Sequence, residues 1–241
     1  QRETDVMIRP ETEAVIMDVP TGLLDPGLSS YLGLRQANER EILKTMLQAE
    51  SAGFDAVAGA CSLDAAVRAA ANLMDIPVVG AGETSIYLAK MMGNRFATIV
   101  SDTPSIEQEE AKIDALGVGR FAISHHPVRC LKIDEETFFS CLEGDYDPVI
   151  HAFFEVAQSC IEDGADVLIS GCGLFSPMLT TRNIRQVEGI PVIDPIQTAL
   201  KFAEMMVEFR AAGMPTISHK GLYLKASKEE IQKGCRQLGL T

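Results

Sequence analysis

The chain has 241 residues, which suits one large or two small domains, and its 46% hydrophobic and 23% charged residues are typical of a globular protein. Its formal net charge of −13 argues against nucleic acids and anionic membranes as partners, because both are bound by clustered Lys and Arg. No run approaches the roughly 20 apolar residues of a membrane span, and the six cysteines are scattered without a C-x-x-C pair, so we expect a cytoplasmic protein with reduced thiols.

Short apolar runs alternate with longer segments of helical spacing. In chain order, the predicted strands are residues 14–19, 56–60, 78–80, 97–100, 167–169 and 192–193. The predicted helices are residues 36–52, 64–74, 85–92, 148–163 and 197–212, with an added helix in the tail around ASKEEIQKG. Strands separated by helices of this length indicate βαβ units around a parallel sheet, so we predict an α/β fold. Open sheets of this kind bind ligands at the carboxyl ends of their strands.

One unit of this pattern occurs twice. The segments GFDAVAGAC, ending at Cys61, and GADVLISGC, ending at Cys172, share a glycine eight residues before the cysteine, an Asp and a buried strand. Each is followed by a helical stretch and a second short strand, IPVVG or IPVID. The duplication predicts two pseudo-symmetric lobes, each a mainly parallel sheet flanked by helices, with the active site in the cleft between them. We assign residues 1–99 with 205–241 to the first lobe and 100–204 to the second.

A cysteine at the end of a parallel strand, just before a helix, has a particular environment. The N–H groups and the positive dipole end of the helix favour the thiolate, which predicts a lowered pKa. A thiolate and a thiol on opposite faces of a carbon next to a carbonyl remove a proton from one face and return one to the other, so the configuration inverts. We therefore predict that Cys61 and Cys172 are a catalytic acid/base pair. Buried hydrophobic roles are expected for the other cysteines, which are Cys130, Cys141, Cys160 and Cys235.

The flanks GACSLDAA and ISGCGLFSP, with IPVVGAGETSIYLAKMMGNRFATIV and IPVIDPIQTALKFAEMM, resemble the motifs of the aspartate/glutamate/hydantoin racemase superfamily over about residues 11–223. The hydantoin racemase branch is the most similar. The resemblance implies a homo-oligomeric isomerase that acts on a small molecule without a metal, pyridoxal phosphate or other cofactor. It places catalysis at Cys61 and Cys172, and substrate binding at Pro20, Thr21, Gly22, Ser62, Leu63, Glu83, Ser101, Gly173 and Leu174. The superfamily opens with a strand and an Asn-Pro-Asn-like loop, and this sequence is expected to start after them, so either that segment is missing from this sequence or the substrate loop is built differently.

The residues after each cysteine bear on the substrate. Glutamate racemases have Asn-Thr after the first cysteine and Thr-His after the second, whereas this chain has Ser62–Leu63 and Gly173–Leu174. These less polar flanks favour a 5-substituted hydantoin or a related amino-acid derivative, with backbone N–H groups after each cysteine holding the enolate oxygen. Aspartate or glutamate racemisation, maleate isomerisation and cysteine-nucleophile chemistry remain alternatives. The superfamily's arylmalonate-type decarboxylases keep one cysteine, so the two cysteines here argue against that branch. A non-catalytic small-molecule binding protein is the alternative from another class.

Other polar features have simpler interpretations. The pair His125–His126 suggests a metal site, but adjacent side chains on an extended segment point in opposite directions, so we expect a solvated loop. Asp64 is expected in the first helical turn after Cys61, either stabilising the helix dipole or orienting substrate, and Asp194 is similarly open. The acidic run 107–110 is expected to be an exposed helix face.

Overall fold

The computed structural model describes residues 7–23 and 26–240, and the chain forms two compact units. Unit 1 contains the chain up to Gly59, the segment Asp64–Gly80 and the chain from Ala199 onward, whereas unit 2 contains Ala60–Leu63 and Ala81–Thr198. These units divide the chain differently from the expected lobes, since residues 81–99 belong to unit 2. The reason is that their strand pairs on both sides with strands of the unit 2 sheet.

Unit 2 is built on a five-stranded sheet with the order β4-β3-β5-β7-β6. Four strands run parallel, and β6 runs antiparallel to β7 at one edge. The bounds are β3 (Phe96–Val100), β4 (Val128–Cys130), β5 (Val167–Ser170), β6 (Gln186–Val187) and β7 (Ile190–Ile193). The two central strands, β3 and β5, are buried at every position, as expected for parallel strands covered on both faces.

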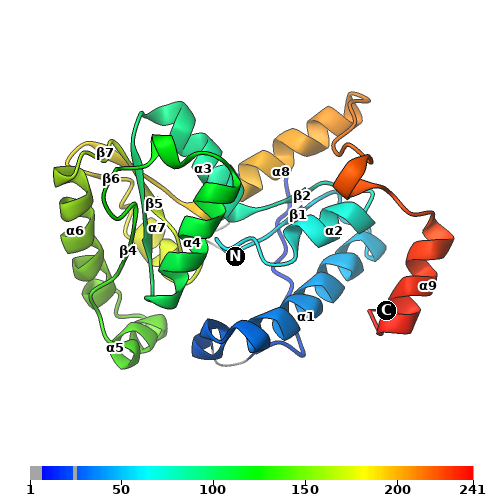
Figure 1. Ribbon diagram of the computed structural model, residues 1–241, viewed down its shortest axis with the longest axis horizontal. Coiled ribbons are helices and arrows are strands. Elements are labelled where there is room, and N and C mark those ends of the chain that lie inside the picture. Colours follow the sequence, from blue (N-terminus) through cyan, green and yellow to red (C-terminus); the bar gives the residue numbers. More distant parts are fainter. Residues whose placement is uncertain (1–6, 24–25, 241) are drawn as a thin grey trace. The chain divides into compact units, whose positions relative to one another are not determined.

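Helices cover both faces of this sheet (Figure 1). They are α3 (Ala81–Met92), α4 (Pro104–Ala115), α5 (Glu135–Ser140), α6 (Asp147–Glu162) and α7 (Ser176–Thr181). Alternate residues of β3 enter different apolar layers, as the period of a strand requires. Ala97 and Ile99 pack with α6 and α7, whereas Phe96 and Val100 pack with α3 and α4. Each fully buried large apolar side chain stabilises these layers by about 1.5–3 kcal/mol.

Unit 1 contains a two-stranded parallel sheet, β1 (Val57–Ala58) and β2 (Val78–Val79), and a small apolar cluster with α1 (Leu32–Ser51) and α2 (Val67–Leu73). Helix α8 (Pro195–Ala211) begins in unit 2 and continues into unit 1. The expected tail helix is present as α9 (Lys228–Leu238) and begins with a capping box formed by Ser227 and Glu230. Short 3-10 helices lie at Pro26–Ser30, Gly119–Phe121, Cys141–Glu143 and Gly221–Tyr223.

The predicted α/β fold class is confirmed, and most predicted elements are present with ends shifted by a few residues. The strand predicted at residues 14–19 is wrong: Val15 and Ile16 are 51% and 70% exposed, and no described strand pairs with this segment. The helix predicted from Asp64 begins only at Val67, because Asp64 and Ala66 have left-handed φ values of 56° and 61°. In the described part of the chain, no helix is both long and apolar enough to cross a membrane.

Candidate active site

Cys172 lies just beyond β5, in the turn that leads to α7. Gly171 N–H donates to the Ile99 carbonyl at 2.7 Å, which continues the pairing of β5 with β3, and Cys172 N–H then turns back to the Ser170 carbonyl at 2.8 Å. The thiol is half-buried, and the chain after Cys172 turns so that the N–H of Leu174 lies 3.5 Å from Cys172 Sγ. The end of the strand therefore presents a sulfur atom to backbone donors.

The pKa of the Cys172 thiol is raised, first because the thiol is removed from water and also because the Asp102 carboxylate lies near it. The Ser101 hydroxyl and the N–H groups of Leu174 and Phe175 act in the opposite direction, since they bond to the sulfur. The predicted lowering of the pKa is therefore wrong for this cysteine. Backbone donors do favour the thiolate, but desolvation outweighs them.

The predicted substrate-contact residue Ser101 lies beside Cys172. Its position follows from the sheet: Ser101 comes directly after β3, and β3 and β5 are parallel neighbours whose carboxyl ends meet. The Ser101 hydroxyl also bonds to Asp102 Oδ2 at 2.8 Å, while Asp102 Oδ1 accepts the N–H of Ser105 at the start of α4 at 3.0 Å. Ser101 is thus held by the residue that opens the next helix.

Cys61 lies on a four-residue segment, Ala60–Leu63, that belongs to unit 2 although both of its flanks belong to unit 1. Cys61 is exposed. A Cβ atom on Gly173 would lie 2.2 Å from the Ala60 carbonyl oxygen, a separation that a side chain cannot adopt. Glycine at this position therefore lets the residue after Cys172 contact the residue before Cys61. The structure brings the two cysteine loops together within unit 2.

Helix α4 provides a second contact to the Cys61 segment. The Lys112 ammonium donates to the Ser62 carbonyl and lies 2.7 Å from Glu109 Oε2. The Glu109 side chain is only 2% exposed, so the expectation that residues 107–110 form a solvated face is wrong at Glu109. A sequence signal for this burial exists, since Glu109 precedes the core residue Ile113 by four positions and therefore shares its helix face.

The remaining predicted site residues lie near a cysteine in sequence or on other elements. Ser62 is buried, and Leu174 is 36% exposed. Glu83 lies in the first turn of α3 and is partly buried. In unit 1, the turn at residues 20–22 is attached to α1, because Thr21 donates to the Glu41 carboxylate and Leu23 N–H donates to Asn38 Oδ1 at 2.9 Å. The substrate roles of Pro20, Thr21, Gly22, Leu63 and Glu83 stay predictions.

Two acidic residues with open roles make contacts within the fold. Asp194 Oδ1 accepts the N–H groups of Ile196 and Gln197 at 2.9 and 3.1 Å, so this carboxylate caps α8. Asp64 lies before α2 rather than in its first turn, and its Oδ1 would be 2.5 Å from a Cβ atom on Gly80. The Asp64 carboxyl group thus packs over the end of β2 within unit 1.

The histidine pair also has a structural explanation. The Arg129 guanidinium donates to the carbonyl oxygens of His125 and His126 at 3.1 and 3.2 Å, which stabilises the turn before β4. Both histidines are exposed, as expected for a loop. Within residues 7–23 and 26–240, no three His, Cys, Asp or Glu side chains are arranged to hold a metal ion.

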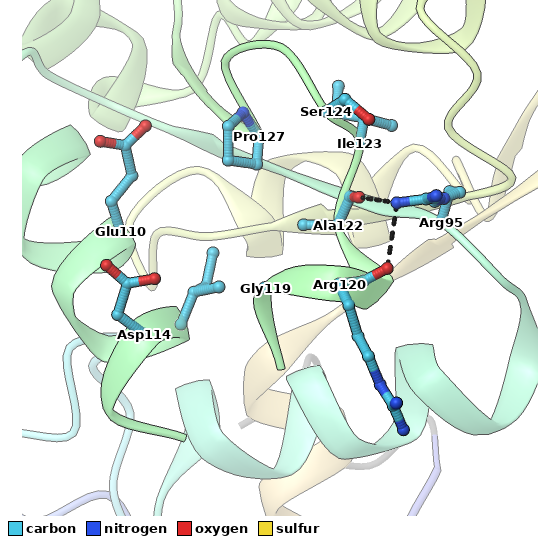
Figure 2. Close-up of a pocket in the computed structure, with 10 residues that line it drawn as sticks. Arg95, Glu110, Asp114, Gly119, Arg120, Ala122, Ile123, Ser124 and Pro127 are labelled. Atoms are coloured by element: carbon cyan, nitrogen blue, oxygen red, sulfur yellow. Dashed lines mark hydrogen bonds between the residues drawn. The ribbon is translucent and has the colours of Figure 1, made fainter. Parts of the chain in front are cut away.

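A separate surface pocket of about 400 Å³ lies at the amino ends of β3 and β4 (Figure 2). Arg95 on one side of it donates to the carbonyls of Arg120 and Ala122 at 3.0 and 2.9 Å, and the carboxylates of Glu110 and Asp114 lie on the other side. Because this pocket adjoins the start of β3 and Ser101 follows its end, the pocket is distinct from the cysteine loops.

Comparison with known proteins places the chain in a family. The sequence profile of the Asp/Glu/Hydantoin racemase family matches residues 5–203. The hydantoin racemase of Pseudomonas sp. (strain NS671) is 30% identical over 171 residues, which are 69% of this chain and 64% of that protein. The hydantoin racemase of Rhizobium meliloti is 26% identical over 170 residues, which are 69% of this chain and 66% of that protein. The matched region thus spans less than two thirds of either relative.

A solved structure shares the fold over nearly the whole chain. The allantoin racemase from Pseudomonas fluorescens superimposes with a TM-score of 0.75 and 24% sequence identity, covering 93% of this chain and 89% of that one. The sequence profile covers most of the chain, including both cysteine loops and the helix that contacts them. This chain belongs to the Asp/Glu/hydantoin racemase family.

Proposed function

We propose that this protein is a cofactor-independent racemase that inverts a carbon next to a carbonyl, with Cys61 and Cys172 as its paired acid and base. The observation that carries the proposal is the contact between Gly173 and the Ala60 carbonyl, which joins the two cysteine loops in one compact unit. A racemase of this kind needs one proton acceptor and one proton donor on opposite faces of the same carbon.

The different environments of the two thiols suggest their resting roles. Since the pKa of Cys172 is raised, Cys172 starts as the thiol and is the proton donor. The Cys61 thiolate removes the proton from one enantiomer, and the C–H electron pair moves into the enolate. The Cys172 thiol then returns a proton to the opposite face, leaving a Cys61 thiol and a Cys172 thiolate. The other enantiomer meets this second form of the enzyme and runs the same steps in reverse.

Backbone donors near Cys172 can hold the negative charge that develops during the reaction. The N–H of Leu174 lies 3.5 Å from the sulfur and the N–H of Phe175 bonds to it, which supports the proposal that N–H groups of this loop hold the enolate oxygen. Fixed donors of this kind stabilise a transition state without reorganising. The hydroxyl of Ser101, on the neighbouring strand end, is the side-chain group proposed to contact substrate.

The proposed substrate is a 5-substituted hydantoin or a related cyclic amino-acid derivative. Leucines follow both cysteines, at Leu63 and Leu174, where a substrate with two carboxylates would require polar groups. The names of the matched relatives, hydantoin racemases and an allantoin racemase, agree with this class. The ring carbonyl beside the reacting carbon acidifies the proton that Cys61 must remove. Aspartate or glutamate is the alternative substrate.

The wider setting also remains a proposal. Six cysteines without a disulfide suit a reducing compartment such as the cytoplasm. The family resemblance favours a homo-oligomer that acts on a small molecule. The predicted contacts from Pro20, Thr21, Gly22 and Glu83 would complete the substrate site.

The test is proton exchange at the reacting carbon in D2O, followed by NMR and polarimetry. Single enantiomers of a 5-substituted hydantoin, of allantoin, of aspartate and of glutamate are incubated with wild type, Cys61→Ser and Cys172→Ser. We expect the wild type to exchange and racemise a hydantoin, and each variant to lose racemisation by at least about 10²-fold while keeping exchange of one enantiomer. Cys130→Ser, which changes a thiol at the end of the neighbouring strand β4, is the matched control and should behave as wild type.

Three outcomes would contradict the proposal. If neither substitution changes the rate of proton exchange, Cys61 and Cys172 are not the acid/base pair. A mass adduct on Cys61 or Cys172 would favour covalent catalysis. Absence of turnover, together with ligand affinity that survives both substitutions, would favour a binding protein.

A further inference from the structure

We infer that Lys112 and Glu109 of α4 are positioning residues for Cys61, because the Lys112 ammonium holds the Ser62 carbonyl and so fixes the Cys61 segment on unit 2. The inference rests on the proposed function only in giving Cys61 a catalytic role. The role that it assigns to Lys112 and Glu109 is indirect. They position Cys61 and do not contact the substrate.

The Lys112–Glu109 pair lies where charges are costly. The side chains are 14% and 2% exposed, and the pair sits beside Ile113, a residue of the apolar layer between α4 and the sheet. Removing two charges from water is unfavourable unless their hydrogen-bonding groups are satisfied, so such pairs are weak evidence for stability alone. An ammonium has three donors. Here it faces the Glu109 carboxylate and also donates to the main chain next to Cys61.

The Cys61 segment needs an external support. Residues 60–63 form neither helix nor strand, and they leave the unit to which residues 57–59 and 64–80 belong. The contact of Ala60 with Gly173 limits how closely the loops approach, but it is a van der Waals contact without direction. The Ser62 hydroxyl is buried and has no hydrogen-bond partner among the residues that the structure describes, so within that part of the chain this side chain does not orient the segment through a bond. A directional contact of this segment is the hydrogen bond that the Lys112 ammonium donates to the Ser62 carbonyl.

Fixing this carbonyl also fixes the next donor. In a planar trans peptide, the C=O of one residue and the N–H of the following residue point in opposite directions. The Leu63 N–H therefore points away from the Lys112 ammonium. This N–H is one of the backbone donors predicted to contact substrate, so a single ammonium orients both the Cys61 loop and its donor.

A positioning role predicts an asymmetry between enantiomers that simple destabilisation does not. If only Cys61 is misplaced, the enantiomer whose proton is removed by Cys172 still exchanges with solvent. The enantiomer whose proton is removed by Cys61 loses exchange, and racemisation fails because it needs both thiols. The pattern of Lys112→Met should therefore match that of Cys61→Ser and not that of Cys172→Ser.

The test measures racemisation and the exchange of each hydantoin enantiomer in full-length Lys112→Met, Glu109→Gln and Lys112→Arg. We expect Lys112→Met to lower kcat by on the order of 10²-fold, as small displacements of reacting groups do, with KM changed less than about threefold. Glu109→Gln should show the same asymmetry more weakly. Lys112→Arg keeps a cationic donor and should recover activity to within about tenfold of wild type. The matched control is Lys201→Met, which breaks another Lys–Glu pair with i,i+3 spacing, on α8, and should leave both exchanges unchanged.

A second readout does not depend on turnover. The rate at which iodoacetamide labels Cys61, followed on its peptide by mass spectrometry, should change at least about threefold in Lys112→Met and not in Lys201→Met. Equal loss of exchange for both enantiomers, or wild-type values in Lys112→Met, would overturn the inference. Should Lys112→Met fail to fold, Glu109→Gln decides by the same criterion. A wild type without exchange would instead overturn the proposed function, and the labelling rates would then decide the inference.

Discussion

At Cys172, desolvation and hydrogen bonding oppose each other on one sulfur atom. Desolvation raises the pKa of the thiol, and the bonds from Ser101 and from the backbone lower it. Removing the Ser101 hydroxyl leaves desolvation unchanged and takes away one group that favours the thiolate. The sign follows directly: in Ser101→Ala the pKa of Cys172 rises further, and less thiolate is present at any pH below it.

The measurement is the pH dependence of iodoacetamide labelling at the Cys172 peptide. We expect the labelling midpoint of Ser101→Ala to move to higher pH, and the rate at a fixed pH below the midpoint to fall by roughly twofold to tenfold. Ser105→Ala is the control, since the Ser105 hydroxyl bonds to both oxygens of Asp102 and is not among the groups that shift the Cys172 pKa. A midpoint that stays in place or moves to lower pH would show that Ser101 does not bond to the sulfur.

Single residues also show how far the sequence predicts the site. The position of Ser101 beside Cys172 is predictable, because both follow neighbouring parallel strands. The raised pKa of Cys172 is not, because the depth of a thiol below the surface depends on packing that no local pattern records. The burial of Glu109 is also missed when the acidic run is judged by composition, which predicts an exposed segment. It becomes predictable only when Glu109 is placed on the same helix face as Ile113.

Among the elements, apolar runs predict the central strands and miss the edges. The runs in β3 and β5 are buried throughout, so their sequences are distinctive. The edge strands β4 and β6 read VRC and QV, which are too short and too polar for the same pattern. The run at residues 14–19 gives the opposite error, since its composition predicts a strand that the structure does not contain there. A strand requires a neighbouring strand as well as a suitable composition.

The segment before this run is attached to α8 by Glu204. Glu204 Oε1 accepts the N–H of Arg9 at 2.8 Å and the hydroxyl of Thr12 at 2.6 Å, and its Oε2 pairs with Lys201. Burial alone would raise the pKa of Glu204, but the Arg9 N–H, Lys201 and Thr12 outweigh it and lower the pKa to about 2. A carboxyl whose pKa is lower in the folded state stabilises the fold above its usual pKa of 4.5, and this contribution is lost as the pH falls toward 2.

We therefore expect Glu204→Gln to lower the free energy of unfolding by about 2 kcal/mol at neutral pH, a value typical of hydrogen bonds to a charged group. The difference between wild type and variant should shrink progressively from about pH 5 to pH 2 in urea-unfolding series. Glu208→Gln, which removes an exposed partner of Arg9, should cost less than about 1 kcal/mol. A Glu204→Gln deficit that is equally large at pH 7 and pH 3 would place the stabilisation in packing rather than in charge.

For the molecule as a whole, the duplicated sequence predicts two cysteine loops but not their location. The repeat suggests that each cysteine belongs to the unit formed by its own flanks. The structure instead places residues 60–63 and Cys172 in the same unit, whereas β1 and β2 belong to the other unit. The position of residues 60–63 in unit 2 depends on contacts with Gly173 and Lys112. Both residues lie more than 45 positions from Cys61 in sequence, so no pattern within one repeat predicts these contacts.

The net charge of −13 gives a further prediction about the substrate. An acidic protein repels anions over about a Debye length, which is roughly 10 Å at 0.1 M ionic strength, and this repulsion weakens as salt is added. A 5-alkyl hydantoin has no net charge at neutral pH, so its kcat/KM should vary by less than about twofold between about 20 and about 300 mM NaCl. A 5-carboxymethyl hydantoin carries the same ring with an anionic side chain and is the matched control substrate. Its kcat/KM should be lower at low salt and should rise as salt increases, when the racemisation of both hydantoins is measured by polarimetry on the wild type.

If the anionic hydantoin is instead preferred at low salt and loses its advantage on adding salt, a positive pocket must lie within the acidic surface. The substrate would then belong with aspartate and glutamate rather than with the neutral hydantoins, because only a carboxylate would gain from such a pocket.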